Sequence, residues 1–221
     1  RPEAFIESAD PEIVALANQL AATLDNPYLI ARAFYDYVAD TIRYELGTTG
    51  FGARFVLDNG AGECGHFAAL FVALCRAQGI PARPVVGHWA ISGLDQYHVW
   101  AEFYLEGIGW VPVDPTIAQQ SEYNRRYYFG HMDNQRVVLS KGYNIELVPE
   151  APSDIRVVPF LQGPWYWFWG DGDGSAFDLA VTGWEVNRLA QPTAAAPTAT
   201  AEPAASAAGA PTILGVELRG E

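Results

Sequence analysis

One segment decides the interpretation of this chain, and it reads Gly60-Ala61-Gly62-Glu63-Cys64-Gly65-His66-Phe67-Ala68-Ala69-Leu70-Phe71. It places Cys64 between a glycine-rich turn and the start of an amphipathic helix. The first N–H groups of a helix have no intrahelical acceptor, and the helix macrodipole adds positive potential at this end. Both effects favour the thiolate form of a cysteine placed there. Cys64 can therefore act as a nucleophile, although a single cysteine at a helix start is more often a small buried residue.

The composition indicates a globular protein that does not bind nucleic acid. Half of the 221 residues are apolar, which is enough to bury a core. The 26 acidic and 13 basic residues give a net charge of −13, and the basic residues form no cluster that could meet a phosphate backbone. No run of about 18 apolar residues is present, so we expect no transmembrane segment. Lys141 is the only lysine.

The two cysteines are predicted to be free thiols. If one helix continues from Cys64 through Cys75, the two residues lie roughly 16 Å apart along its axis. A disulfide requires Cα atoms within about 7 Å of each other. This spacing therefore argues against a bridge.

Apolar residues repeat with helical spacing in the first half of the chain. Helix starts are predicted at Asp10-Pro11 and Asn26-Pro27, where a capping residue precedes a proline. A third helix is predicted over residues 64–78 and ends at Gly79-Ile80-Pro81. Between the second and third helices, a glycine-rich loop is expected over residues 46–62.

The apolar period changes to two in the second half, which indicates strands. Strands are predicted over residues 82–90, 97–105 and 110–113, separated by turns that contain glycine. Residues 135–158 contain further short strand candidates. Helices followed by hairpin-linked strands are typical of the α+β class.

A cysteine nucleophile needs a base, a group that orients the base, and donors for the oxyanion. His98 and Asp114 can fill the first two roles. His98 lies within a predicted strand, and Asp114 ends the next strand of the same hairpin, within reach of the imidazole. Considered separately, a strand histidine is more often a packed residue, and Asp-Pro is an ordinary turn. Their occurrence together with Cys64, in this order, favours a catalytic Cys-His-Asp triad.

Further residues are expected to surround this triad. The backbone N–H of Cys64 is one oxyanion donor, and Tyr44 is our candidate for a side-chain donor. Trp100 shares a strand face with His98 and is expected to line the cleft. The other expected lining residues are Glu63 and His88.

Structural roles are the commoner ones for several polar residues near the predicted cleft. His88 can pack against its neighbours instead of lining the cleft. His66 lies two residues after Cys64, about 200° around the helix, so it is expected to cap the helix or to pack. Arg83 is expected to form a structural ion pair.

Four segments together resemble the transglutaminase-like superfamily, particularly its bacterial branch. They are Gly62-Glu63-Cys64-Gly65-His66-Phe67-Ala68, Leu74-Cys75-Arg76-Ala77-Gln78-Gly79-Ile80-Pro81-Ala82-Arg83, His98-Val99-Trp100-Ala101-Glu102 and Gly109-Trp110-Val111-Pro112-Val113-Asp114-Pro115-Thr116. The resemblance covers about residues 30–160, and residues 133–142 look like an extension that many bacterial members carry after the core. It implies a papain-like α+β core with N-terminal helices, in which the Cys64 helix packs on an antiparallel sheet.

The resemblance also implies roles for the triad. Cys64 would be the nucleophile, His98 the base and Asp114 the orienting acid, in thioester chemistry without a metal or an organic cofactor. The large animal members use a tryptophan upstream of the cysteine to bind the oxyanion, and no tryptophan precedes Cys64 here. Tyr44 would then take this role. Those members also use calcium, but Asp171-Gly172-Asp173-Gly174-Ser175 lacks the glycine and glutamate of an EF-hand loop, so no metal site is predicted.

We therefore predict an enzyme that transfers or hydrolyses acyl groups of peptide carboxamides, of the transglutaminase, deamidase or protease type. The expected substrate is a peptide or protein that carries Gln or another carboxamide, and the acyl acceptor is an amine or water. One alternative is a catalytically silent module that binds peptide or cell-wall polymer through its cleft or through Trp165-Tyr166-Trp167-Phe168-Trp169. Another is a peptidase or peptidoglycan amidase with the same catalytic groups.

One domain and a tail are expected. Residues 1–190 are predicted to form the catalytic domain, including a C-terminal extension over residues 130–190, and residues 191–221 a flexible tail. Residues 192–210 are almost wholly Ala, Pro, Thr and Ser, which is too poor in bulky apolar groups to fold. The chain begins at Arg1 rather than Met, which we interpret as a trimmed form. These features leave the compartment open but favour an exported, extracytoplasmic bacterial protein, and we expect a monomer.

Overall fold

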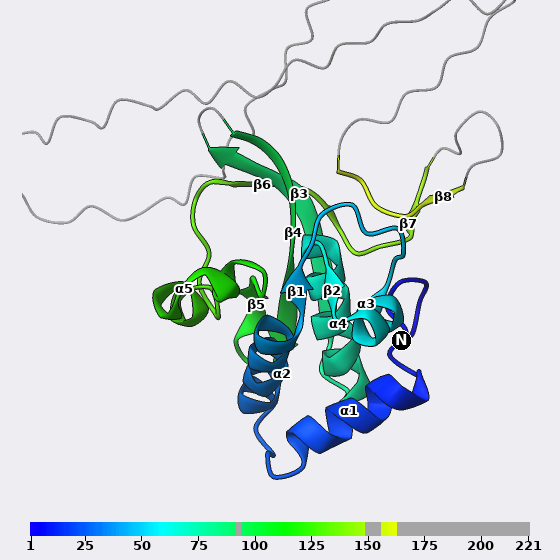
Figure 1. The fold of residues 1–221 in the computed structure, drawn as a ribbon, viewed down its shortest axis with the longest axis vertical. Coiled ribbons are helices and arrows are strands. Elements are labelled where there is room, and N and C mark those ends of the chain that lie inside the picture. Colours follow the sequence, from blue (N-terminus) through cyan, green and yellow to red (C-terminus); the bar gives the residue numbers. More distant parts are fainter. Residues whose placement is uncertain (92–93, 149–155, 163–221) are drawn as a thin grey trace, which may run out of the picture. The chain divides into compact units, whose positions relative to one another are not determined.

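The helix that carries Cys64 lies at the centre of the fold. The computed structural model describes residues 1–91, 94–148 and 156–162. In it, α4 (Cys64–Ala77) is buried at every residue from 66 to 75. Three helices contact α4, namely α1 (Pro11–Ala21), α2 (Pro27–Thr41) and α3 (Ala53–Asn59). Figure 1 shows these three helices gathered around α4.

The predicted starts of the first two helices are confirmed. The side chain of Asp10 accepts a hydrogen bond from the N–H of Glu12 at 2.9 Å, and Pro11 begins α1. The side chain of Asn26 accepts a hydrogen bond from the N–H of Tyr28 at 2.9 Å, and Pro27 begins α2. Both caps satisfy an N–H group that has no acceptor within the helix.

The continuous loop predicted over residues 46–62 is wrong, because this segment contains α3 and the strand β2 (Ala61–Gly62). Strand β2 pairs in parallel with β1 (Arg43–Tyr44). At the start of α3, the N–H of Ala53 donates a hydrogen bond to the carboxylate of Glu7 at 2.9 Å. The acceptor is thus distant in the sequence, and no capping pattern near Ala53 predicts α3.

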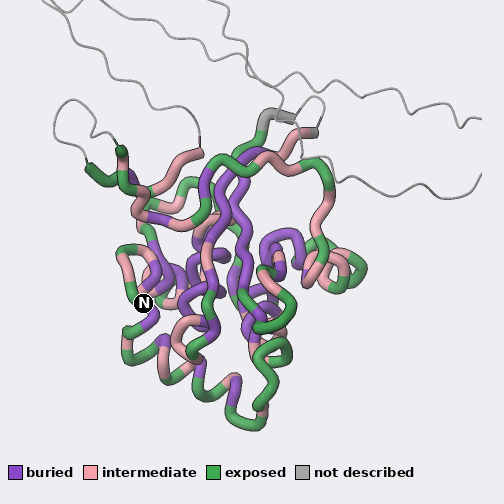
Figure 2. Tube along the Cα trace, turned by 180° about the vertical axis from the view of Figure 1, so that it is seen from behind, coloured by how far each residue is buried: buried purple, intermediate pink, exposed green. Residues whose placement is uncertain are grey.

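The main sheet has four antiparallel strands in the order β5-β4-β3-β6. They are β3 (Ala82–Ile91), β4 (Leu94–Leu105), β5 (Gly109–Val113) and β6 (Arg136–Lys141). Strands β3 and β4 contact α4, and Figure 2 shows the buried residues concentrated in this central region. The prediction of an α+β fold, with the Cys64 helix packed on an antiparallel sheet, is confirmed.

Smaller elements follow the hairpin of β4 and β5. They are the 3₁₀ helix η1 (Ile117–Gln120), α5 (Glu122–Tyr127), and the strand pair β7 (Ile145–Glu146) and β8 (Val157–Val158). Strands β6, β7 and β8 account for the candidates predicted over residues 135–158. The aromatic segment 165–169, the acidic turn 171–175 and the tail 191–221 lie outside the described residues.

One group of charges joins three strands of the main sheet. Glu102 on β4 accepts a hydrogen bond from Nε of Arg83 on β3 at 2.5 Å. It also accepts one from Nζ of Lys141 on β6 at 3.0 Å. The structural ion pair predicted for Arg83 is confirmed, and the only lysine of the chain takes part in the same group.

Neither a membrane-spanning helix nor a metal-binding cluster is found among the described residues. None of their helices has the length and apolarity needed to cross a membrane. Nor do they bring together three or more His, Cys, Asp or Glu side chains in a way that could hold a metal ion.

Candidate active site

The first turn of α4 is fixed by the loop that precedes it. The N–H of Glu63 donates a hydrogen bond to Nδ1 of His66 at 3.0 Å, so the imidazole proton is on Nε2. That Nε2–H donates to the carbonyl of Gly50 at 2.8 Å. The carboxylate of Glu63 accepts a hydrogen bond from the N–H of Gly47 at 2.7 Å. His66 therefore has the capping and packing role that the sequence predicts, and it holds the turn on which Cys64 lies.

The two cysteines have different surroundings on the same helix. Cys75 is fully buried in the apolar core, and burial raises the pKa of its thiol well above the usual range. Cys64 is only partly buried and lines a cavity. Both are free thiols, as predicted. Among the described residues, the N–H groups of Cys64 and Gly65 have no protein acceptor, which is typical of the first turn of a helix.

His98 and Asp114 meet as the sequence predicts. Nε2 of His98 lies 2.7 Å from Oδ2 of Asp114, and both side chains are almost fully buried. Cys64 and His98 line the same cavity, and the interaction with Cys64 is one of the causes that raise the pKa of the imidazole. Because Nε2 is engaged with Asp114, Nδ1 is the nitrogen left for Cys64. Of the three predicted triad residues, His98 on β4 thus contacts Asp114 at the end of β5, and it shares the cavity with Cys64 on α4.

The charges around His98 favour the protonated, imidazolium form of its side chain. Burial alone would lower the pKa of His98, but the carboxylate of Asp114 and the interaction with Cys64 outweigh burial and raise it to about 9. Burial alone would raise the pKa of Asp114, but the charges of His98 and Arg136 and the hydrogen bonds it accepts lower it to about 2. Asp114 is therefore ionised at neutral pH, and it stabilises the proton on His98.

Asp114 is held by four donors. Its Oδ1 accepts hydrogen bonds from the N–H groups of Thr116 and Ile117, both at 3.2 Å. Its Oδ2 accepts one from Nη1 of Arg136 at 2.6 Å, in addition to the contact with His98. Arg136 begins β6 and was not anticipated from the sequence. No local signal marks its contact with the candidate active site, because Asp114 is 22 residues away in the chain.

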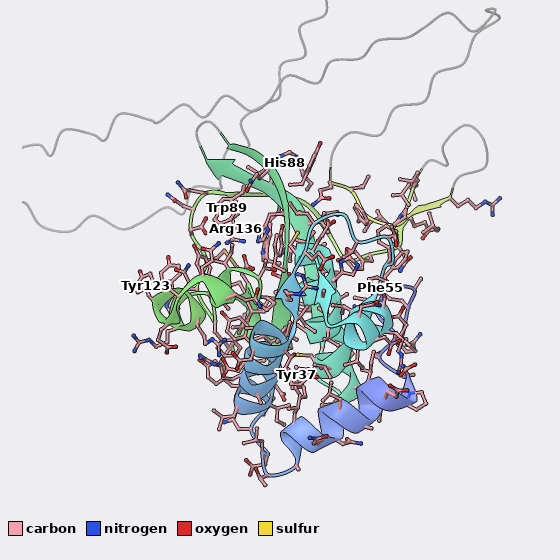
Figure 3. The ribbon with its side chains drawn as sticks, viewed as in Figure 1. Tyr37, Phe55, His88, Trp89, Tyr123 and Arg136 are labelled. Atoms are coloured by element: carbon pink, nitrogen blue, oxygen red, sulfur yellow. The ribbon has the colours of Figure 1, made fainter. Side chains whose placement is uncertain are left out.

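The side chain of Arg136 is buried, with 3% exposed, and is surrounded by aromatic rings. Its guanidinium carbon lies 5.0 Å from the ring centre of Trp89, 5.3 Å from that of Trp100 and 5.2 Å from that of Tyr128. Its Nε donates a hydrogen bond to Asp133 at 3.0 Å. Figure 3 labels Trp89 and Arg136 beside each other, above α5.

A cavity of about 720 Å³ opens at Cys64. Its polar and reactive lining includes Cys64, His98, Glu63, Tyr44 and Tyr143. Exposed apolar side chains surround it as well, among them Leu46, Phe51 and Tyr97. Among its described lining residues there is no lysine, arginine or aspartate, and Glu63 is the only glutamate.

The structure corrects two of the predicted lining residues. Trp100 is 4% exposed and does not line the cavity, because it lies two residues beyond His98, where Arg136 covers its ring. His88 is 5% exposed, and its Nε2 lies 3.1 Å from the carbonyl of Gln162. Adjacent residues of a strand face opposite sides. Trp89 lines the cavity, whereas His88 does not, and the ring of Tyr97 lies against that of His88 with 4.3 Å between the ring centres.

Two tyrosines lie close to the first turn of α4. Tyr44 lines the cavity as expected of an oxyanion donor, and burial and the nearby charges of Cys64 and Glu63 raise the pKa of its hydroxyl. Tyr143, which was not anticipated, donates a hydrogen bond from its hydroxyl to the carbonyl of Gly65 at 3.0 Å. Its segment follows β6, so only the folded chain brings it to the cavity.

Comparison with known proteins finds a family to which part of the chain is similar. The family model described as the transglutaminase-like superfamily matches residues 14–115. A protein-glutamine gamma-glutamyltransferase of Pseudomonas aeruginosa is 30% identical over 122 residues, which are 48% of this chain and 18% of that protein. Residues 14–115 of this chain are therefore similar to the transglutaminase-like superfamily.

Two solved structures are similar to part of this chain. A candidate cysteine protease from Cytophaga hutchinsonii is 26% identical with a TM-score of 0.53, and the match covers 64% of this chain and 45% of that one. The periplasmic domain of TgpA from Pseudomonas aeruginosa is 32% identical with a TM-score of 0.42, covering 48% of this chain and 42% of that one. In each case the matched region is less than half of the relative.

Proposed function

We propose that this protein is a cysteine-dependent enzyme that transfers or hydrolyses acyl groups of peptide carboxamides. The observation that carries the proposal is that Cys64 and His98 line one cavity while His98 contacts the buried carboxylate of Asp114 at 2.7 Å. A thiol, an imidazole and a buried carboxylate in this order are the groups that nucleophilic acyl transfer requires. The relatives described as a transglutaminase and a candidate cysteine protease support the same class of reaction.

The first half of the proposed reaction forms a thioester. The thiolate of Cys64 attacks the carboxamide carbon, and the C=O bond becomes a C–O⁻ single bond. The N–H of Cys64 donates to this oxyanion, and the hydroxyl of Tyr44 is the proposed second donor. His98 then gives its proton to the nitrogen of the leaving group, the C–N bond breaks, and ammonia or an amine departs.

The second half releases the acyl group. His98, now neutral, takes a proton from an attacking amine or water, whose nitrogen or oxygen forms a bond to the thioester carbon. The C–S bond breaks and the thiolate of Cys64 is restored beside the imidazolium. Asp114 stays ionised throughout and fixes the imidazole through Nε2. An amine acceptor gives transamidation, whereas water gives deamidation.

The cavity indicates which substrates fit near the reacting carbon. Its exposed apolar side chains suit apolar or aromatic residues beside the carboxamide, and the carboxylate of Glu63 lies next to Cys64. No lysine or arginine among the described lining residues is available to bind a substrate carboxylate. We therefore propose Gln side chains in peptides, and neutral or cationic acceptors, as the substrates.

Cleavage of peptide bonds by the same groups is a second candidate. The likeness to the candidate cysteine protease favours it, because that match covers more of this chain than the matches to the transglutaminase and the TgpA domain do. In this case the leaving group is a peptide amine rather than ammonia, and the remaining steps are unchanged.

One experiment separates these reactions. A Gln-containing peptide is incubated with the protein, with and without a primary amine, and the products are identified by mass spectrometry. Loss of ammonia with gain of water indicates deamidation, incorporation of the amine indicates transamidation, and shorter peptides indicate proteolysis. Cys64→Ala should abolish every product, whereas Cys75→Ala, in the core, should retain the reaction. Full turnover by Cys64→Ala would refute the proposal.

A catalytically silent binding module predicts a different outcome. In that case Cys64 has no reason to be reactive, and iodoacetamide at mildly acidic pH should modify neither cysteine. Rapid labelling of Cys64, with Cys75 unmodified, supports the enzyme. The extracytoplasmic location and the monomeric state stay predictions.

A further inference from the structure

Two cationic side chains share one oxygen of Asp114. Nε2 of His98 lies 2.7 Å and Nη1 of Arg136 lies 2.6 Å from the same Oδ2. Asp114 is fully buried, and its other oxygen is occupied by two backbone N–H groups. The negative charge that stabilises the His98 imidazolium is therefore divided between the imidazolium and a permanent cation.

The charges continue past Arg136 in alternating sign. Asp133 accepts a hydrogen bond from Nε of Arg136, and it is the outermost member, with 17% of its side chain exposed. Asp133 also accepts a hydrogen bond from the hydroxyl of Tyr128 at 3.0 Å and one from the N–H of Gln135 at 2.9 Å. The series of groups runs from the imidazole of His98 through the carboxylate of Asp114 and the guanidinium of Arg136 to a second carboxylate near solvent.

The buried position of the Arg136 guanidinium costs folding stability. Its Nη2 is buried and has no hydrogen-bond acceptor among the described residues. A buried donor without an acceptor costs free energy, and burying the cation costs more. An apolar side chain among the rings of Trp89, Trp100 and Tyr128 would avoid both costs. The buried arginine is therefore better explained by the effect of its positive charge on the carboxylate of Asp114.

We propose that Arg136 is a positioning residue that limits how strongly Asp114 holds the proton on His98, so that His98 can release it to the leaving group. This inference rests on the acid and base role of His98 in the proposed function. Without Arg136, the full charge of Asp114 would act on the imidazolium, and the proton would be a poorer donor to the departing amine. Arg136 also fixes the orientation of the carboxylate toward Nε2.

The groups that face the two cations come from several elements. His98 on β4 faces Cys64 from α4 and Asp114 from the end of β5, and its ring lies 5.3 Å from that of Trp89 on β3. Arg136 on β6 faces Asp114, Asp133 and Tyr128. The other titratable residues of the described cavity lining are Tyr44, Glu63, His66, Tyr97 and Tyr143. Because the variants below leave these unchanged, differences between variants report on Arg136 and Asp133.

The test measures the titration of the His98 imidazole by NMR in the full chain. All variants are made in a Cys64→Ala background, which removes the thiolate and makes the readout independent of turnover. The chain has only four histidines, and comparison with His98→Gln assigns the signal. Failure of the proposed function would therefore leave this measurement intact.

Opposite shifts in the pKa of His98 are expected when the charge of Arg136 and that of Asp133 are removed. Arg136→Gln removes a positive charge and should raise the pKa of His98 by about one unit or more. Asp133→Asn removes the negative charge that offsets Arg136, and should lower the pKa of His98 by a fraction of a unit, since Asp133 is farther away and partly exposed. Arg136→Lys keeps the positive charge, so the pKa of His98 in this variant should be close to that in the parent protein.

A merely structural role gives other results. If Arg136 only fills space, the pKa of His98 should be the same in Arg136→Gln, Arg136→Lys and the parent, and that result would overturn the proposal. A shift of the same sign in Asp133→Asn and Arg136→Gln would overturn it as well. If Arg136→Gln does not fold, Arg136→Met, which is neutral and of similar length, takes its place, and an unchanged pKa of His98 in that variant would overturn the proposal.

Discussion

The part of the chain that the family model matches and the part that follows it contribute different things to the candidate active site. Residues 14–115 contain Cys64, His98 and Asp114, the groups proposed to react. Residues 116–162 contain Arg136, which contacts Asp114, and Tyr143, which contacts the first turn of α4. The matched region thus carries the proposed chemistry, and the following segment holds those groups in position.

This difference has a physical reason. A nucleophile and its base need particular atoms at particular places, which a helix start and a strand provide locally. A restraint on those atoms can come from any segment that reaches them, since a hydrogen bond or a charge acts through space. The following predictions test whether the two regions differ in this way.

The largest difference is expected between two aspartates changed in the same way. Asp114→Asn should lower kcat for ammonia release from a Gln peptide by about 10³ to 10⁴-fold, because the amide cannot fix the imidazole as the carboxylate does. Asp133→Asn, the matched change in the following segment, should lower kcat by less than about tenfold. Equal losses in the two variants would contradict the division between regions.

A smaller loss is expected when the proposed oxyanion donor is removed. Tyr44→Phe should lower kcat by about 10 to 10³-fold with a lesser change in KM, because the hydroxyl acts on the charge that develops in the transition state. Tyr97→Phe is the control, since Tyr97 lines the cavity but lies on β4. Full activity of Tyr44→Phe would remove Tyr44 from the mechanism.

Tyr143 should affect stability more than chemistry. Tyr143→Phe removes the donor to the carbonyl of Gly65 and should lower the free energy of unfolding by about 1 kcal/mol, measured by urea denaturation. Tyr123→Phe is the control, because Tyr123 is 67% exposed, and it should be neutral. A loss of activity in Tyr143→Phe as large as that in Tyr44→Phe would show that the following segment takes part in the chemistry.

The smallest effect expected is a pH dependence of stability. The pKa of His98 is raised to about 9 in the folded protein, above its unfolded value of about 6.5. Its contribution to stability is therefore fully present below about pH 6.5 and is lost as the pH rises toward 9. The decrease should be absent in His98→Gln. Urea denaturation of both proteins across this pH range measures the difference, and parallel curves would contradict the shift.

Much of the fold and of the triad could be predicted because the signals are local. The caps at Asp10 and Asn26 precede their helices directly, and the alternation of apolar residues marks β3 and β4. Cys64, His98 and Asp114 each lie at a helix start or in a hairpin that the sequence identifies. Their meeting then follows from how a helix packs on the strands beside it.

The rest depends on contacts between distant segments. Helix α3 is short, and its first N–H groups bond to Glu7, so its sequence looks like a loop. Arg136 lies in a short strand, where a charged residue is usually exposed, and becomes buried only because Asp114 and Asp133 face it. Trp100 shares the strand face of His98, but alternation does not reveal that Arg136 covers it.

The ion pair of Lys141 has a practical consequence for any cross-linking assay. Lys141 is the only side-chain primary amine in the sequence, and it is held 3.0 Å from the carboxylate of Glu102. If the protein joins Gln to amines, its own side chains offer a single acceptor, engaged by a neighbour. Self-coupled products should accordingly be scarce, and a mass increase on an added amine-bearing protein can be read almost without background.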